Sequence, residues 1–213
     1  MIPLPRHVEP EWLDSLDPDD PRAVRARRDL RLINFLMGNE GWLLRQVAAR
    51  RETAGQGIVE LGSGEGHLLR RLARLGPATG CDLAPRPPDL AREIDWLEGD
   101  LFSLAEPLSG GILVANLVLH HFSAEDLLRI GRIADRFKTL LFVEPHRSRR
   151  ALALARILSP FVGEVTRHDM PASIHAGFAA GDLHEAMGLS AAWSVSEVRH
   201  WCGSLRFVAS RLA

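Results

Sequence analysis

The stretch IVELGSGEGHLL, residues 58–69, decides the fold of this 213-residue chain. An apolar run leads into three alternating glycines and then into leucines, which predicts a strand, a tight turn and the start of a helix. Glycines at alternate positions let the backbone turn sharply and let a ligand approach main-chain atoms that a Cβ would cover. A dinucleotide-binding loop would have its third glycine at position 67, which is His67, and a P-loop would contain Gly-Lys-Ser/Thr. The spacing therefore disfavours both of these loops.

From residue 58 onward, short apolar runs alternate with amphipathic stretches, which is the pattern of βαβ units around a parallel sheet. The fold class predicted is α/β, with a Rossmann-like, seven-stranded, mostly parallel sheet, a C-terminal antiparallel hairpin and an N-terminal helical segment. The expected strands are 58–61, 78–82, 94–98, 111–116, 139–144, 193–198 and 205–210, with a tight turn at residues 202–204. The expected helices of this part are 66–75, 88–93, 124–137, 148–158 and 182–187, and residues 162–181 are expected to form a loop rich in His and Gly.

The residues before the sheet form a segment of their own. Residues 1–20 contain several prolines and no hydrophobic periodicity, so we expect an extended arm there. Asp20 followed by Pro21 is typical of a helix start and predicts a helix over 21–37, with a second helix over 41–51. We therefore divide the chain into an arm and helical cap, residues 1–54, and a ligand-binding domain, residues 55–213. Trp12, Phe35 and Trp42 could close the cap over a ligand or simply anchor it to the domain.

Composition excludes several function classes. The 26 basic and 27 acidic residues give a net charge of −1, which offers no general attraction for nucleic acid or for an anionic membrane surface. The cysteines, Cys81 and Cys202, form no CxxC or Cys/His cluster, which removes the disulfide-scaffold and zinc-finger interpretations. No apolar run approaches the length of a membrane span. We expect a soluble, cytoplasmic protein that binds no nucleic acid and no membrane and could form a homodimer.

Acidic residues end the second and third predicted strands. Asp82 ends the second strand, where its carboxylate could accept hydrogen bonds from both hydroxyls of a ribose. The third strand ends in Glu98-Gly99-Asp100, and an acid there, beside Leu101 and Phe102, could meet an adenine amino group against an apolar wall. A glycine-rich turn followed by acids at two successive strand ends favours a nucleoside ligand.

With these motifs the chain resembles the class I S-adenosylmethionine-dependent methyltransferases, from about residue 58 to the C-terminus. The resemblance rests on the glycine turn, on the acids Asp82 and Asp100, and on the sequence NLVLHHF at residues 116–122. It implies S-adenosylmethionine as the cofactor, with Asp82 on the ribose and Asp100 on the adenine. It also implies that Glu60 positions the loop. The positions that it implies for cofactor binding are Glu60, Gly62, Gly64, Gly66, Asp82, Asp100 and Asn116.

A softer likeness is to bacterial small-molecule methyltransferases of natural-product type. It rests on LHHF after the fourth strand and on FVEPH, residues 142–146, at the end of the fifth. This likeness implies methyl transfer to oxygen or carbon of a small organic acceptor, phenolic or polyketide-like. The alternative is a catalytically silent protein that keeps the cofactor pocket, and a second rival is an NAD-dependent reductase.

His120 and His121 are the candidate catalytic residues. They follow the fourth strand at its carboxyl end, which is the edge where open α/β sheets bind ligands, so one of them could deprotonate a phenol, an enol or an activated carbon. They could equally be a helix-entry pair, one packing and one lining the cofactor by its backbone. His146, His168 and His175 are weaker candidates, the last two because they fall in the expected loop.

A metal site is not expected. Some methyltransferases of this class orient catechols with Mg²⁺ through carboxylates at strand ends. Here Asn116 and Glu144 are the available ligands, and no third carboxylate joins them in the sequence pattern.

Overall fold

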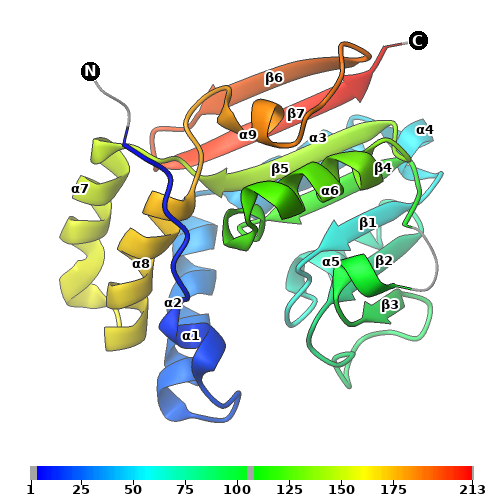
Figure 1. The fold of residues 1–213 in the computed structure, drawn as a ribbon. Coiled ribbons are helices and arrows are strands. Elements are labelled where there is room, and N and C mark those ends of the chain that lie inside the picture. Colours follow the sequence, from blue (N-terminus) through cyan, green and yellow to red (C-terminus); the bar gives the residue numbers. More distant parts are fainter. Residues whose placement is uncertain (1–3, 105–107, 213) are drawn as a thin grey trace.

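The chain folds around one seven-stranded sheet in the strand order β3-β2-β1-β4-β5-β7-β6 (Figure 1). The structure is a computed structural model that describes residues 4–104 and 108–212. The strands are β1 (Ile58–Leu61), β2 (Ala78–Asp82), β3 (Asp95–Glu98), β4 (Ile112–Asn116), β5 (Thr139–Pro145), β6 (Trp193–Arg199) and β7 (Ser204–Arg211). The first five pair in parallel, and β7 runs antiparallel to both β5 and β6. This arrangement confirms the predicted fold class and all seven strands.

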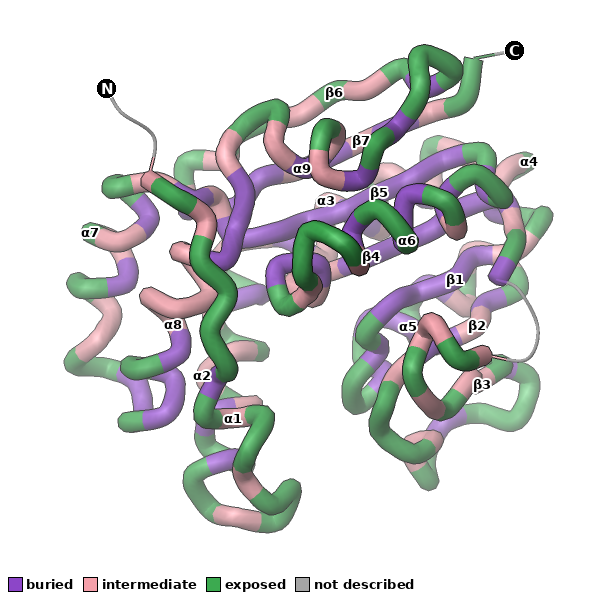
Figure 2. Tube along the Cα trace, in the orientation of Figure 1, coloured by how far each residue is buried: buried purple, intermediate pink, exposed green. Residues whose placement is uncertain are grey.

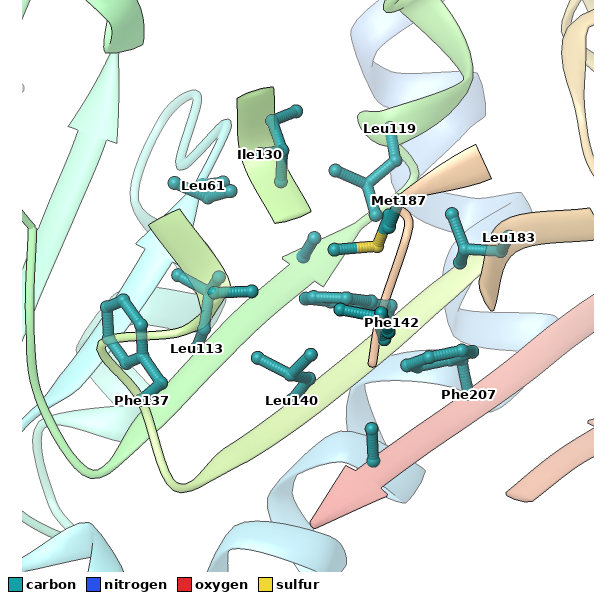
Figure 3. Packing of buried hydrophobic residues seen from close by; sticks show 14 of the residues in the cluster. Leu61, Leu113, Leu119, Ile130, Phe137, Leu140, Phe142, Leu183, Met187 and Phe207 are labelled. Carbon is teal, nitrogen blue, oxygen red and sulfur yellow. The ribbon is translucent and has the colours of Figure 1, made fainter. Parts of the chain in front are cut away.

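Helices cover both faces of the sheet because the central strands are apolar on both sides. In β4, Leu113 belongs to one buried cluster and Val114 to the other, as the two-residue repeat of a strand requires. The first cluster packs under α6 (Ala124–Ala134) and α9 (Asp182–Ala186), and Figure 3 shows Phe142, Phe207 and Met187 within it. The second packs under α3 (Asn39–Ala48), α4 (Arg51–Ala54) and α5 (His67–Leu72). Strands β4 and β5 are accordingly the longest buried stretches of the chain trace in Figure 2.

A separate group of helices lies beyond the carboxyl ends of the strands (Figure 1). It consists of α1 (Trp12–Ser15), α2 (Pro21–Leu36), α7 (Arg149–Leu158) and α8 (Glu164–Ala176). The start of α2 is as predicted, because the Asp20 carboxylate accepts the N–H of Arg22 and Pro21 takes the first helical position. These helices therefore stand where ligands of open α/β sheets bind.

Two of the sequence predictions are wrong. Residues 164–176 form helix α8 and not a loop, and residues 88–93 form turns and not a helix. Helix α8 lacks a side-chain cap of its own and contains Pro171. Instead, Asp29 of α2 accepts the N–H of Gly163 at 2.7 Å and the hydroxyl of Thr166 at 3.3 Å, so the cap comes from a distant part of the chain. No local sequence signal marks such a cap.

The N-terminal arm is extended up to α1, a single helical turn. The carboxylate of Asp169 in α8 accepts the N–H groups of Trp12 at 2.9 Å and Leu13 at 3.1 Å. Arg6 donates to the carbonyl oxygens of Ala176, His120 and Phe122. These bonds fix the arm along α8 and next to the end of β4. Among the residues described, no helix is long and apolar enough to cross a membrane.

Candidate active site

The glycine turn joins β1 to α5 in the left-handed backbone region. Gly62, Gly64 and Gly66 have φ values of 65°, 51° and 71°. A Cβ on Gly62 would lie 2.5 Å from Cγ2 of Val118, so only glycine fits there. A Cβ on Gly64, in contrast, would meet nothing within 4 Å. The turn is therefore packed on the side of Gly62 and open on the side of Gly64.

Asp82 lies beside this turn at the end of β2. One carboxylate oxygen accepts the N–H of Gly64 at 2.6 Å, and the other accepts the N–H of Ala84 at 2.8 Å. The carboxylate remains partly exposed, so its other lone pairs stay open to a ligand. Asp82 thus shapes the glycine turn and offers acceptors next to its open side.

Glu60 is buried in β1, and its Oε2 has no hydrogen-bond partner among the described residues. Burial raises the pKa of Glu60 well above its usual range, and the nearby carboxylates of Glu40 and Asp82 raise it further. The side chain therefore holds a proton more readily than an exposed glutamate does.

Asp100 starts the short 3₁₀ helix η1 (Leu101–Ser103). Its carboxylate accepts the N–H of Phe102 at 3.1 Å and the hydroxyl of Ser103 at 3.0 Å, so it serves as an N-cap there. Gly99, just before it, has φ 126° and open space where a Cβ would stand. The acid predicted to meet adenine thus has a structural role, and its side chain stays exposed.

The loop after β4 is held in a strained conformation. Leu117 has φ 58°, the one positive value of a non-glycine residue in the described chain. Asn116 precedes it, and its buried Oδ1 has no hydrogen-bond partner among the described residues. Strain and an unpartnered polar atom at one place are common features of functional sites.

A cavity of about 380 Å³ opens at the carboxyl ends of the strands. Gly64, Asn116 and Leu117 form its floor, and His120 and His121 line it as well. Much of its remaining lining is apolar and comes from helices α2, α7 and α8 and from the residue after α2. These apolar residues are Leu30, Ile33, Met37, Ala151, Leu154, Ala155, Leu158, Met170 and Ile174. The structure therefore brings four of the predicted site residues into one cavity, namely Gly64, Asn116, His120 and His121. Glu60, Gly62, Gly66, Asp82 and Asp100 do not line it.

His120 lies in the 3₁₀ helix η2 (Leu119–His121) and is buried between two carboxylates. Its Nδ1 lies 2.8 Å from Oε2 of Glu144, and its Nε2 lies 3.6 Å from Oε1 of Glu11. Burial lowers the pKa of His120, but Glu11 and Glu144 outweigh burial and raise it to about 9. At neutral pH this imidazole is therefore protonated.

His121 is about one-third exposed and has the opposite tendency. Burial and the adjacent His120 lower its pKa, against the attraction of Glu11 and Asp14. The two rings lie 4.2 Å apart between centroids, and Nδ1 of His121 lies 3.8 Å from Oδ2 of Asp14. Neighbouring groups whose environments push their pKa values apart are typical of acid and base pairs.

Sequence reasoning missed Glu11 and Asp14, which also line the cavity. They belong to the arm and to α1, over 100 residues from the histidines, so no spacing in the sequence connects them. Of the weaker histidine candidates, His168 of α8 stacks on Trp12 of α1. His146 and His175 do not line the cavity.

Metal ligation can also be judged from the geometry. Glu11, His120 and His121 each offer a ligand atom, and these atoms lie within 4.8 Å of one another. Glu144, considered above as a ligand, is turned instead toward the N–H groups of Val118 and Leu119.

The comparisons with known proteins identify the fold. No family model and no curated protein matches this sequence. Solved structures do match: the plantazolicin methyltransferase BpumL in complex with SAH has a TM-score of 0.64 at 12% identity, over 92% of each chain. Magnesium protoporphyrin IX methyltransferase (ChlM) from Synechocystis PCC 6803 with bound SAH has a TM-score of 0.61 at 17% identity, over 87% of this chain and 86% of that one. The pyocyanin biosynthetic protein PhzM also has 0.61 at 17%, over 94% of this chain and 61% of its own.

These similarities define the class of fold. The chain has the Rossmann-like fold of small-molecule methyltransferases, with the antiparallel C-terminal strands in place. At identities of 9–17% the likeness establishes the fold, and function has to be argued from the site.

Proposed function

We propose that this protein is a methyltransferase that transfers a methyl group from S-adenosylmethionine to oxygen or carbon of a small, largely apolar acceptor. The observation that carries the proposal is the open side of the glycine turn. There Gly64 forms part of the cavity floor, and its N–H is held by the Asp82 carboxylate at 2.6 Å. Cofactor and acceptor would share the cavity.

The residues present fit the cofactor in three respects. A Cβ on Gly64 would meet no protein atom within 4 Å, so a ligand can approach the main chain of the turn there. Asp82 keeps acceptor lone pairs for ribose hydroxyls. Asn116 lines the cavity, and its buried Oδ1 has no partner in the described chain, as expected where a ligand supplies an N–H group. Glu60 would act by positioning the turn. Gly62 and Gly66 would shape the turn, and Asp100 would face the adenine.

S-adenosylmethionine supplies a methyl group bound to a sulfonium sulfur. An acceptor atom attacks the methyl carbon in line with the carbon–sulfur bond, and the sulfur is the leaving group. The protein therefore has to align the acceptor, exclude water and remove a proton from a weakly acidic group. Apolar side chains of α2, α7 and α8 would hold the acceptor and keep water out. His120 and His121 line the cavity together with Glu11, and the proton would be taken there. A cavity with many apolar side chains and two imidazoles favours an apolar acceptor with one acidic hydroxyl or activated carbon, such as a phenol or a polyketide-like molecule.

The relatives in fold support the cofactor assignment. BpumL and ChlM were both solved with SAH, and ChlM also with SAM. Their names describe a plantazolicin methyltransferase and a magnesium protoporphyrin IX methyltransferase, which agrees with an organic acceptor here.

The proposal is tested by calorimetry and then by product analysis. S-adenosylmethionine and S-adenosylhomocysteine should bind in titration calorimetry and NAD should not. A panel of phenols and polyketide-like compounds should then yield products heavier by one methylene in mass spectrometry. Binding without any product across a broad panel would favour the alternative, a catalytically silent cofactor-binding protein. Binding of NAD alone would contradict the proposal.

A further inference from the structure

Glu11 of the N-terminal arm is placed at the cavity by several independent contacts. Its side chain is 9% exposed, and the hydroxyl of Ser173 in α8 donates to it. The next two residues give their N–H groups to Asp169, one helical turn before Ser173. A carboxylate that is buried and fixed in this way is costly unless it stabilises a charge nearby.

That charge is on His120. Both of its ring nitrogens face carboxylates, Nδ1 toward Glu144 at 2.8 Å and Nε2 toward Glu11 at 3.6 Å. With a neutral imidazole, the two buried carboxylates would lose the charge between them. Arg6, which also attracts Glu144, donates its hydrogen bonds to carbonyl oxygens. An imidazolium between the two carboxylates partly offsets their charge and gives each a partner. The arm and the end of β5 thus hold His120 from opposite sides.

His121 is the imidazole that remains free. It lies against His120, with centroids 4.2 Å apart, and a second positive charge at that distance is unfavourable. The charged groups that face the pair are Glu11 and Arg6 on the arm, Asp14 on α1 and Glu144 on β5. Arg6 donates to the carbonyl oxygen of His120 at 3.1 Å. Of the two histidines, only His121 has a substantially exposed side chain, at 35% against 4%.

We propose that Glu11 is a positioning residue of the active site: with Glu144 it holds His120 as an imidazolium, which leaves His121 as the base for the acceptor. The opposite directions of the two pKa values, upward for His120 and downward for His121, agree with this assignment. The role of His121 as base rests on the proposed function, whereas the charge on His120 does not.

The proton and electrons balance in the resulting step. His121 accepts the proton of the acceptor hydroxyl, and the oxygen forms its bond to the methyl carbon. The carbon–sulfur bond of the cofactor breaks with its electron pair left on sulfur, so S-adenosylhomocysteine leaves neutral at sulfur. The proton on His121 then passes to water once the products leave.

The first test is an NMR titration of the histidine ring protons in the intact protein without added ligand. We expect His120 to titrate well above pH 6.5 and His121 below it. In Glu11→Gln the midpoint of His120 should fall by about one pH unit or more, since one of its two carboxylates is lost. Glu9→Gln is the matched control, because Glu9 lies on the same arm, is exposed and pairs with His7. It should leave both midpoints in place.

The second test uses activity on an acceptor found in the product screen. His121→Asn should lower kcat by a hundredfold or more, in the range of general base catalysis. Glu11→Gln should lower kcat about tenfold and shift its pH profile, Glu11→Asp should recover part of the loss, and both should bind S-adenosylhomocysteine within twofold of the parent. If His120 titrates below His121 in the unaltered protein, or if Glu11→Gln leaves the His120 midpoint where it was, the inference is wrong. Absence of cofactor binding would overturn the proposed function alone, because the NMR result stands apart from it.

Discussion

Nδ1 of His120 lies 2.8 Å from Oε2 of Glu144, and the same carboxylate accepts the N–H groups of Val118, Leu119 and His120. Glu144 is fully buried at the end of β5, whereas these amides belong to the loop after β4. One side chain therefore fixes the loop, the orientation of the imidazole and the distance between the two strand ends. Glu144 therefore holds in place the loop after β4, which borders the cavity.

This relationship predicts how stability depends on pH. The pKa of His120 is raised from 6.5 to about 9 in the folded protein. Its stabilising contribution is therefore complete below pH 6.5 and is lost as the pH rises from 6.5 through 9. Full loss corresponds to roughly 3 kcal/mol of unfolding free energy. Chemical denaturation at a series of pH values should show this decline, and the decline should be absent in His120→Asn. If the unfolding free energy of the parent protein does not change with pH over this range, His120 is not held as an imidazolium between Glu11 and Glu144.

The open side of the glycine turn predicts that Gly64→Val abolishes cofactor binding. The branched side chain would occupy the open space beside the turn where the cofactor is proposed to bind, and it would oppose the positive φ of 51°. Gly181→Val is the control for strain alone, since Gly181 also has a positive φ, 92°, with open space around it, and does not line the cavity. Calorimetry with S-adenosylhomocysteine should detect no binding to Gly64→Val and normal binding to Gly181→Val. Normal affinity in both would place the ligand elsewhere.

From the position of the arm we predict that deleting it lowers acceptor turnover and leaves cofactor affinity nearly unchanged. Deletion of residues 1–20 removes Glu11 and Asp14 from the cavity lining and Arg6 from the carbonyl oxygen of His120, and it uncovers His120. Turnover should drop at least a hundredfold, while the affinity for S-adenosylhomocysteine should stay within about threefold. If the melting temperature and cofactor affinity fall together, or if only a dimer dissociates, the arm is a structural element and not a cap over the acceptor.

The sheet could be predicted from the sequence because its strands and turns depend on residues that are close together in the chain. The glycine turn and the Asp20-Pro21 helix start each depend on neighbouring residues, and both are present in the structure. Helix α8 and the site at its side depend on distant contacts. Asp29 caps α8, and Asp169 of α8 caps α1 in turn. Glu11 reaches His120 only through these two long-range caps, so sequence reasoning found the histidines and missed their carboxylate.

The side chains of Glu11, His120 and His121 also lead to a prediction about metal dependence. Since His120 is held by hydrogen-bonded and ionic contacts to carboxylates, we expect methyl transfer to proceed without a metal ion. Dialysis against EDTA should leave kcat and the cofactor affinity unchanged, and mass spectrometry of the purified protein should find less than one-tenth equivalent of zinc, manganese or iron. Loss of activity on chelation that zinc or manganese restores would show that Glu11, His120 and His121 bind a metal.

The most direct test of the proposed cofactor site is the affinity of Asp82→Ala for S-adenosylmethionine, measured by titration calorimetry beside the parent protein. A charge-assisted hydrogen bond contributes roughly 1.5–3 kcal/mol, so the variant should bind about ten- to a hundredfold more weakly. Asp135→Ala serves as control, because Asp135 is an exposed acid after α6 that pairs with Arg211 of β7 and does not line the cavity. Weakened binding to Asp82→Ala alone would agree with a cofactor held by the glycine turn and Asp82. Equal affinities of the parent and a correctly folded Asp82→Ala would contradict it.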